Sequence, residues 1–124
     1  MTRSAASRLH VFASGLLLLI GTAHVAVTFI QYESASLDAL WFLGSGFFVL
    51  TAGAFNLLVA ASHTPATSQG LWTIVLLTNG MGGLLAAGFM WLTGLKEPQG
   101  LLLLLAFVAC GAAMTRVRTA VGTR

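Results

Sequence analysis

The sequence predicts an all-α fold, an antiparallel up-down bundle of four transmembrane helices. Hydrophobic residues make up 57% of the 124 residues and charged residues only 7%, whereas a soluble domain carries roughly a quarter of its residues as charged ones. Four apolar stretches of about membrane-spanning length are joined by short polar connections, which favour antiparallel neighbours. Only helices satisfy their backbone groups within one segment in lipid, and the leucine runs exclude the alternating pattern of a β-barrel.

The first predicted span covers residues 9–30 and follows a polar, basic stretch, residues 1–8, which we expect to be frayed. Arg3 and Arg8 ahead of a leucine run are also compatible with a cleaved signal peptide. The apolar core of such a peptide is normally about 7–15 residues long. This segment is longer and three more apolar segments follow it, so we expect a retained span.

The other three spans follow at short intervals within one predicted domain, residues 1–124. The second, residues 39–61, contains the uncharged run WFLGSGFFVLTAGAFNLL. A turn marked by Pro and small polar residues precedes the third span, residues 70–93. The fourth and shortest span, residues 100–115, follows the turn GLKEPQ, whose proline suits the first turn of a helix.

The charged residues predict the orientation in the membrane. Five bases lie at the chain ends, namely Arg3, Arg8, Arg116, Arg118 and Arg124. All three acids, Glu33, Asp38 and Glu97, lie in the first and third connections, on the opposite side of the predicted bundle from the chain ends. The positive-inside rule therefore predicts a multi-pass protein of the bacterial inner membrane with both termini in the cytoplasm. So few bases at the chain ends and in one loop do not form a DNA-binding face, so we expect the lipid bilayer as a partner and no nucleic acid.

Two asparagines within the spans predict a structural clamp. At a rise of about 1.5 Å per residue, Asn56 and Asn79 both lie on the inner side of the membrane centre, near enough in depth to form a hydrogen bond between helices. The predicted inner faces contain small and polar residues at helical spacing: His10, Ala13, Leu17, Gly21, His24, Thr28 and Gln31 in the first span; Trp41, Ser45, Ala52, Asn56 and His63 in the second; Asn79, Gly83 and Ala87 in the third.

His24 is the residue in the spans for which a functional role is most plausible on chemical grounds. It lies about 6–7 Å to the outer side of the membrane centre, where the second span offers Trp41, Gly44 and Ser45. An imidazole in lipid still needs a donor and an acceptor, so we expect it to contact a hydroxyl or a small pocket. These four residues form the predicted ligand-binding site.

We expect no cofactor and no catalytic site, because no Gly-rich phosphate loop, HExxH motif or nucleophile elbow occurs in the sequence. His10 and His63 share the inner depth and are weak candidates for a metal site, since two histidines without further ligands hold a metal poorly. The single Cys110 cannot form an intrachain disulfide.

The segments GTAHVAVTF, LWFLGSGFFVLTAGAFNLL and KEPQ together resemble small bacterial four-helix integral membrane proteins of about this length. In size and helix count the chain is also similar to DoxX-like proteins. The resemblance covers nearly the whole chain and implies location and architecture. It implies no activity.

The sequence leaves three functional hypotheses open. The first is a non-enzymatic structural or accessory protein that works in a homo-oligomer or a larger membrane complex, since small-residue faces suit further helix association. The second is a module that binds haem, a quinone or another lipophilic ligand through His24. The third is a minimal small-molecule transporter in which His24 is the titratable group within the membrane.

Overall fold

The computed structural model describes residues 4–61 and 69–122, with side chains described up to Arg116. These residues form four α-helices and no strand: α1 (Ala5–Gln31), α2 (Leu37–Ala61), α3 (Gln69–Leu92) and α4 (Pro98–Gly122). The all-α prediction is confirmed. All four helices are long and apolar enough to cross a membrane, and the protein is therefore a small multi-pass membrane protein.

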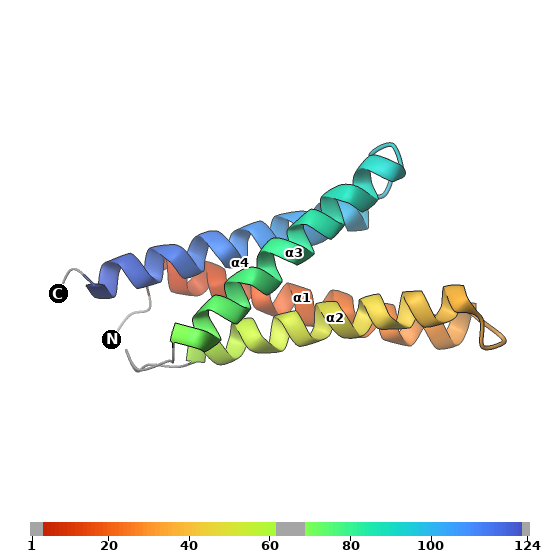
Figure 1. The fold of residues 1–124 in the computed structure, drawn as a ribbon, viewed down its shortest axis with the longest axis horizontal. Helices are drawn as coiled ribbons and strands as arrows, with labels where there is room; N and C mark the ends of the chain where they lie inside the picture. Colours follow the sequence, from red (N-terminus) through yellow and green to blue (C-terminus); the bar gives the residue numbers. More distant parts are fainter. Residues whose placement is uncertain (1–3, 62–68, 123–124) are drawn as a thin grey trace.

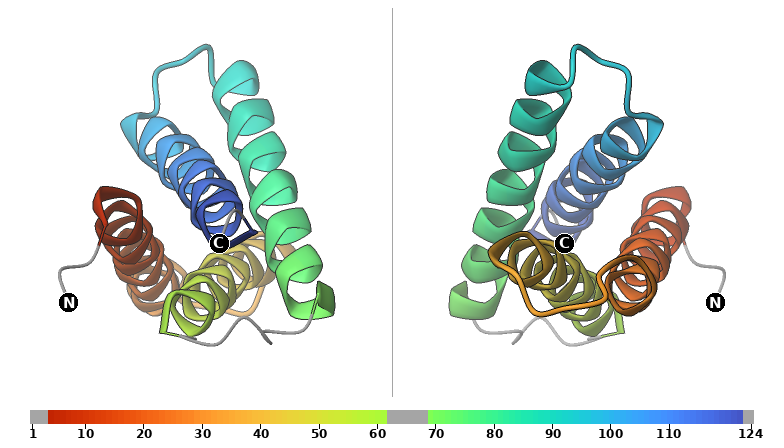
Figure 2. Two further views of the ribbon diagram at one scale, coloured as in Figure 1. Left: turned by 90° about the vertical axis from the view of Figure 1, so that its left-hand side faces the viewer. Right: turned by 90° about the vertical axis from the view of Figure 1, so that its right-hand side faces the viewer.

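The four helices run alternately up and down, but they do not enclose a regular square bundle. α1 packs along α2, α4 packs on α1, and α3 packs on α4, whereas α2 and α3 touch over only a short length. Figure 1 shows that α3 crosses near the end of α2 and then rises away from it toward the turn that joins α3 to α4. The two end-on views in Figure 2 show the same divergence. One side of the bundle is therefore open between α2 and α3.

All four helices extend beyond the predicted spans at one end or both, and α1 and α4 extend furthest. The expectation of a frayed stretch through residue 8 was wrong, because α1 begins at Ala5. The hydroxyl of Ser4 accepts a hydrogen bond from the Ser7 backbone N–H at 3.2 Å and caps the helix. At the other end of the chain, α4 continues past the predicted end at residue 115 to Gly122. Helices extend into water once capped, so apolar length underestimates them.

The turn between α3 and α4 reverses the direction of the chain, so that these two helices pack against each other. Gly94 and Leu95 both have positive φ, at 63° and 64°. The N–H of Gly94 binds the Trp91 carbonyl and the N–H of Leu95 binds the Met90 carbonyl, at 3.2 and 2.8 Å. This is the Schellman ending that glycine favours. α4 then starts at Pro98, as predicted.

Glycines bring α1 and α2 into close contact. A methyl group on Gly21 would lie 2.6 Å from the backbone N of Leu50, and one on Gly53 would lie 2.9 Å from the backbone N of Leu18. Neither position can hold a Cβ without displacing backbone atoms. Small residues that allow helix backbones to approach closely are the usual basis of packing in membranes.

The buried residues of α1 include most of its predicted inner face, but His24 is only half-buried and Gln31 is exposed, and the buried core also corrects the predicted face of α3. In α3 the buried residues are Val75, Asn79, Gly82, Ala86 and Met90. The predicted stripe had Gly83 and Ala87 instead, but Gly83 is half-buried and Ala87 exposed. Repeated steps of four residues drift by about 40° per step around a helix, because a turn has 3.6 residues. The real stripe combines steps of four with one step of three, from Asn79 to Gly82.

Candidate functional site

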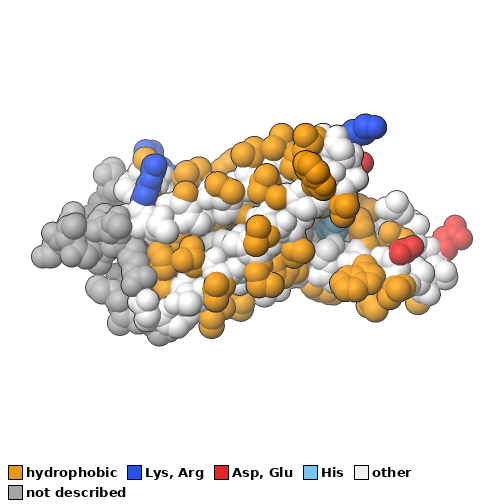
Figure 3. Space-filling view, turned by 45° about the horizontal axis from the view of Figure 1, so that its top comes forward, with side chains coloured by type: hydrophobic (Ala, Val, Ile, Leu, Met, Phe, Trp, Pro, Cys, Tyr) orange, Lys and Arg blue, Asp and Glu red, His pale blue; other side chains and the backbone are white. Residues whose placement is uncertain are grey.

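A cavity of about 800 Å³ lies on the open side, at the end of the molecule that carries the α1–α2 connection and the α3–α4 turn. All four helices line it. Its residues are His24, Tyr32, Asp38, Trp41, Phe42, Gly44, Ser45, Phe48, Val49, Gly82, Leu85, Ala86, Phe89, Gln99, Leu103 and Phe107. In the space-filling view of Figure 3, a histidine side chain is visible in the hollow between the two diverging parts.

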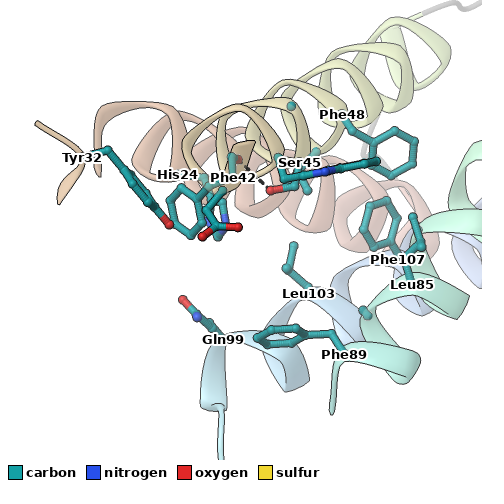
Figure 4. A pocket seen from close by; sticks show the side chains of 16 residues that line it. His24, Tyr32, Phe42, Ser45, Phe48, Leu85, Phe89, Gln99, Leu103 and Phe107 are labelled. Atoms are coloured by element: carbon teal, nitrogen blue, oxygen red, sulfur yellow. Dashed lines mark hydrogen bonds between the residues drawn. The ribbon is translucent and has the colours of Figure 1, made fainter. Parts of the chain in front are cut away.

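Three neighbouring rings form the wall that α1 and α2 contribute. The imidazole of His24 lies parallel to the ring of Phe42, with centroids 4.1 Å apart and planes 15° from parallel. Tyr32 meets the same Phe42 ring at 5.9 Å in a tilted arrangement. Figure 4 shows the three side chains next to one another at one end of the cavity. Stacking holds the imidazole by its face and leaves its two nitrogens at the edge.

Of the two contacts expected for His24, a hydroxyl or a small pocket, the structure shows the pocket, since His24 lines the cavity and the Ser45 hydroxyl does not bond to it. The Ser45 hydroxyl donates to the Phe42 carbonyl oxygen of its own helix at 2.7 Å. Serine in a helix commonly satisfies itself in this way on the preceding turn. Among the described residues, no side chain forms a hydrogen bond with the His24 ring, so its partner in the protein is the Phe42 face.

Two further aromatic residues close the inner end of the cavity. Phe48 of α2 and Phe107 of α4 lie with their ring centroids 6.2 Å apart. The ring of Phe107 also occupies the space above Gly82, so that a side chain added there would have to displace the ring. The opposite wall is formed by α3 and α4, from which Phe89, Gln99 and Leu103 face the stacked rings across the cavity (Figure 4).

A fully buried polar network lies toward the end of the bundle at which α1 begins and α2 ends, where α2 and α3 meet. The side-chain amides of Asn56 and Asn79 donate to each other's oxygens at 2.8 and 3.0 Å. The Asn56 amide nitrogen also donates to the Ala52 carbonyl at 2.9 Å. This bond fixes the orientation of the amide, so the Asn56 oxygen is the atom that lies 3.0 Å from His10 Nε2. Because that oxygen can only accept, His10 donates to it.

The network therefore joins three helices through one side chain. Asn56 uses both N–H groups and both acceptor positions of its amide. The contact between the two asparagines, expected from their depth, is present. Their role as a stabilising clamp remains a prediction.

The histidine pair considered for a metal site is not brought together in the described residues. His10 is directed at Asn56, and His63 lies outside the described residues. Within the described part of the chain, no group of three His, Cys, Asp or Glu residues could hold a metal ion. Cys110 is buried beside Ser14, with the sulfur 3.8 Å from the hydroxyl oxygen.

The structure brings the four predicted ligand-binding residues to one cavity, since His24, Trp41, Gly44 and Ser45 all line it. Trp41 and Ser45 share the helix face of Asn56, but both are exposed, because α3 has moved away at their level. Sequence reasoning missed the contributions of α3 and α4. Aromatic residues within an apolar span resemble lipid-facing residues, so no sequence signal marked Phe89 or Phe107.

The contact of His10 with Asn56 was also missed, although a signal for it existed. His10 lies five residues after the start of α1 and Asn56 five residues before the end of α2, so antiparallel packing places them at one depth. Comparison with known protein families, with curated proteins and with solved structures gave no match to this chain. The resemblance to small bacterial four-helix proteins therefore stays an expectation, and any function has to be inferred from the geometry of the cavity.

Proposed function

We propose that this protein binds a small lipophilic molecule in the cavity between α2 and the α3–α4 pair, without catalysing a reaction on it. The observation that carries the proposal is the convergence of all four helices on one cavity of about 800 Å³. Sites for drug-sized ligands have volumes of roughly 300–1,000 Å³ and combine apolar walls with a few polar groups.

The residues that line the cavity have this combination of apolar walls and a few polar groups. Aromatic and aliphatic side chains form most of the surface, and His24, Ser45 and Gln99 are polar groups on three different helices. The His24 ring nitrogens have no hydrogen bond within the described residues. An unpaired polar group in a medium without water is unfavourable, and a bound molecule with one polar group would provide the missing partner.

The shape of the bundle supports entry of the ligand from the lipid. α2 and α3 touch near the inner end and diverge toward the outer end, so the cavity lies along the side that these two helices leave open. A lipophilic molecule dissolved in the bilayer could move between the two helices without crossing water.

Filling the cavity with a side chain tests the proposal. A Cβ on Gly44 would meet no atom within 4 Å, so Gly44→Phe places a ring in the cavity without a backbone clash. Gly88 of α3 is equally open but does not line the cavity, and Gly88→Phe is the matched control. Native mass spectrometry of protein extracted gently from membranes should show a retained small molecule on the wild type and on Gly88→Phe. Gly44→Phe should lose it.

Equal retention by both variants, or no bound molecule on the wild type, would contradict the proposal. A retained haem or quinone would identify the ligand among the classes that the sequence left open. The same spectra test the second candidate, an accessory or homo-oligomeric role, which the open side between α2 and α3 supports, since a partner helix could pack there. In that case the wild type should appear as a complex of higher mass, and Gly44→Phe should dissociate it.

We also propose that both termini face the cytoplasm of a bacterial cell. α1 begins and α4 ends at the same end of the molecule, and Arg8 and Arg116 lie there, as the positive-inside rule requires of a cytoplasmic side. A fluorescent-protein fusion at the carboxyl end should be bright and an alkaline-phosphatase fusion inactive. The reverse pattern would invert the topology and place the cavity in the cytoplasmic half of the membrane.

A further inference from the structure

The charges around the cavity are of one sign. Among the described residues that line it, Asp38 is the one with a formal charge, and no Lys or Arg is present. Asp38 lies in the first turn of α2, which a Ser36 hydroxyl caps by accepting from the Ala39 N–H at 3.1 Å. The helix end explains an acid at this position, because it favours negative charge. It does not explain why the cavity lacks any basic residue.

The acids as a set are also concentrated at this end of the molecule. Glu33 and Asp38 lie in and after the α1–α2 connection, and Glu97 lies in the α3–α4 turn. Figure 3 shows the acidic side chains at the end where the two parts diverge, together with one base, while the other described bases lie at the opposite end. Lys96, that one base, does not line the cavity. An anion entering the cavity would therefore meet a carboxylate and no compensating positive charge.

Aromatic rings provide a second feature that favours positive charge. Tyr32, Trp41, Phe42, Phe48, Phe89 and Phe107 all line the cavity. The face of each ring carries the negative part of its quadrupole and attracts a cation, most strongly where water is excluded. The same rings offer large apolar contact area. A single carboxylate at the edge of a ring-lined cavity is therefore complementary to a cation that also carries apolar groups.

We propose that the ligand of this cavity is an organic cation with large apolar or aromatic substituents, with the Asp38 carboxylate as its counter-charge. This inference rests on the proposed function and deepens it by naming the chemical class of the ligand. Asp38 supplies the charge and the rings supply the apolar and cation–π contacts. His24, stacked on Phe42, extends the ring surface of the cavity that Asp38 also lines.

Tetraphenylphosphonium and tetraphenylborate test the inference, because they have the same shape and opposite charge. Binding of each ion to purified full-length protein in detergent is measured by equilibrium dialysis, with protein-free micelles as the blank. The variants are Asp38→Asn, Glu33→Gln and Gly44→Phe. Glu33 is exposed, does not line the cavity and gives the same change in net charge as Asp38→Asn. Protection of the buried Cys110 from a maleimide confirms that each variant is folded.

We expect the wild type and Glu33→Gln to bind the phosphonium ion with similar affinity. Asp38 is exposed, so Asp38→Asn should weaken this binding about fivefold, the loss expected for opposite charges roughly 4 Å apart in water. Tetraphenylborate should not bind the wild type measurably, and Gly44→Phe should abolish binding of the phosphonium ion.

Four results would overturn the inference. They are no binding of the phosphonium ion by the wild type, equal weakening by Asp38→Asn and Glu33→Gln, equal binding of the two ions, and unchanged binding by Asp38→Asn. If Asp38→Asn binds as the wild type does and Gly44→Phe still abolishes binding, the cavity binds a ligand whose charge is irrelevant. In that case the proposed function stands, and the inference that the ligand is a cation is wrong. Phosphonium binding that Gly44→Phe leaves unchanged counts against both.

Discussion

Substitution of Asn56 by alanine should destabilise this protein more than any other single loss of a polar side chain. The Asn56 amide forms three hydrogen bonds to other helices, two with Asn79 and one with His10. Hydrogen bonds between helices in membranes average about 0.6 kcal/mol, with a maximum near 1.7. Asn56→Ala should therefore lower the free energy of unfolding by about 2–5 kcal/mol, on the basis of three such bonds.

The two hydrogen bonds between Asn56 and Asn79 also allow a prediction for the double variant. Asn79→Ala loses two of these bonds and should cost about 1–3 kcal/mol by the same count. The double variant loses no bond between helices that Asn56→Ala has not already lost. Its destabilisation should therefore equal that of Asn56→Ala and fall clearly short of the sum of the two single effects, as expected for residues in direct contact.

The single buried cysteine provides the assay without further engineering. Cys110 is fully buried, so pulsed labelling with a maleimide over a series of SDS fractions in dodecyl maltoside reports the unfolded fraction. Thr78→Ala is the control, because the Thr78 hydroxyl bonds only to the Ile74 carbonyl of its own helix. That variant should change stability by less than about 0.5 kcal/mol, as surface substitutions usually do. Strict additivity of the two asparagine effects, or an Asn56→Ala effect no larger than that of Thr78→Ala, would refute the proposed clamp.

Three more predictions follow from the packing. Gly21→Ala should lower the free energy of unfolding by about 1–3 kcal/mol, because its Cβ would lie 2.6 Å from the Leu50 backbone N. Gly15→Ala is the control and should be close to neutral, because a Cβ there would meet nothing within 4 Å. Similar midpoints of SDS unfolding for both variants would contradict the close α1–α2 contact. Cys110 in the native protein should resist a membrane-permeant maleimide and react fully in SDS, and rapid native labelling would show that the core is open. Gly94→Ala should cost about 1 kcal/mol, because φ is +63° at this position; an unchanged unfolding midpoint would count against the left-handed turn.

The two levels of the bundle have different physical properties. At the level where α2 and α3 meet, buried amides and small residues connect α1, α2 and α3. At the other level, α3 leaves α2 and the space between them is lined by rings. A buried, hydrogen-bonded level beside an open one is a suitable arrangement for a binding site, because the cavity does not have to support the fold.

The sequence alone was sufficient to predict the four helices, the membrane class and most of the inner face of α1. Those features depend on local properties: apolar length, the need of the backbone for internal hydrogen bonds in lipid, and the 3.6-residue period. The depth of each residue along its helix was also enough to predict that Asn56 lies opposite Asn79. The four residues nominated around His24 belong to two helices that are adjacent in the chain, so short-range reasoning could place them near one another.

Only the tertiary structure decided which helices pack on which, and that decision creates the cavity. A lipid-facing surface and a helix-facing surface are both apolar in a membrane protein, so periodicity in Phe89, Leu103 or Phe107 carries no information about their partner. The stacking of His24 on Phe42 and the direction of His10 toward Asn56 depend on side-chain rotamers and on contacts far apart in the chain. The divergence of α3 from α2 depends on how α3 packs against α4, a contact between whole helices that local sequence patterns do not encode.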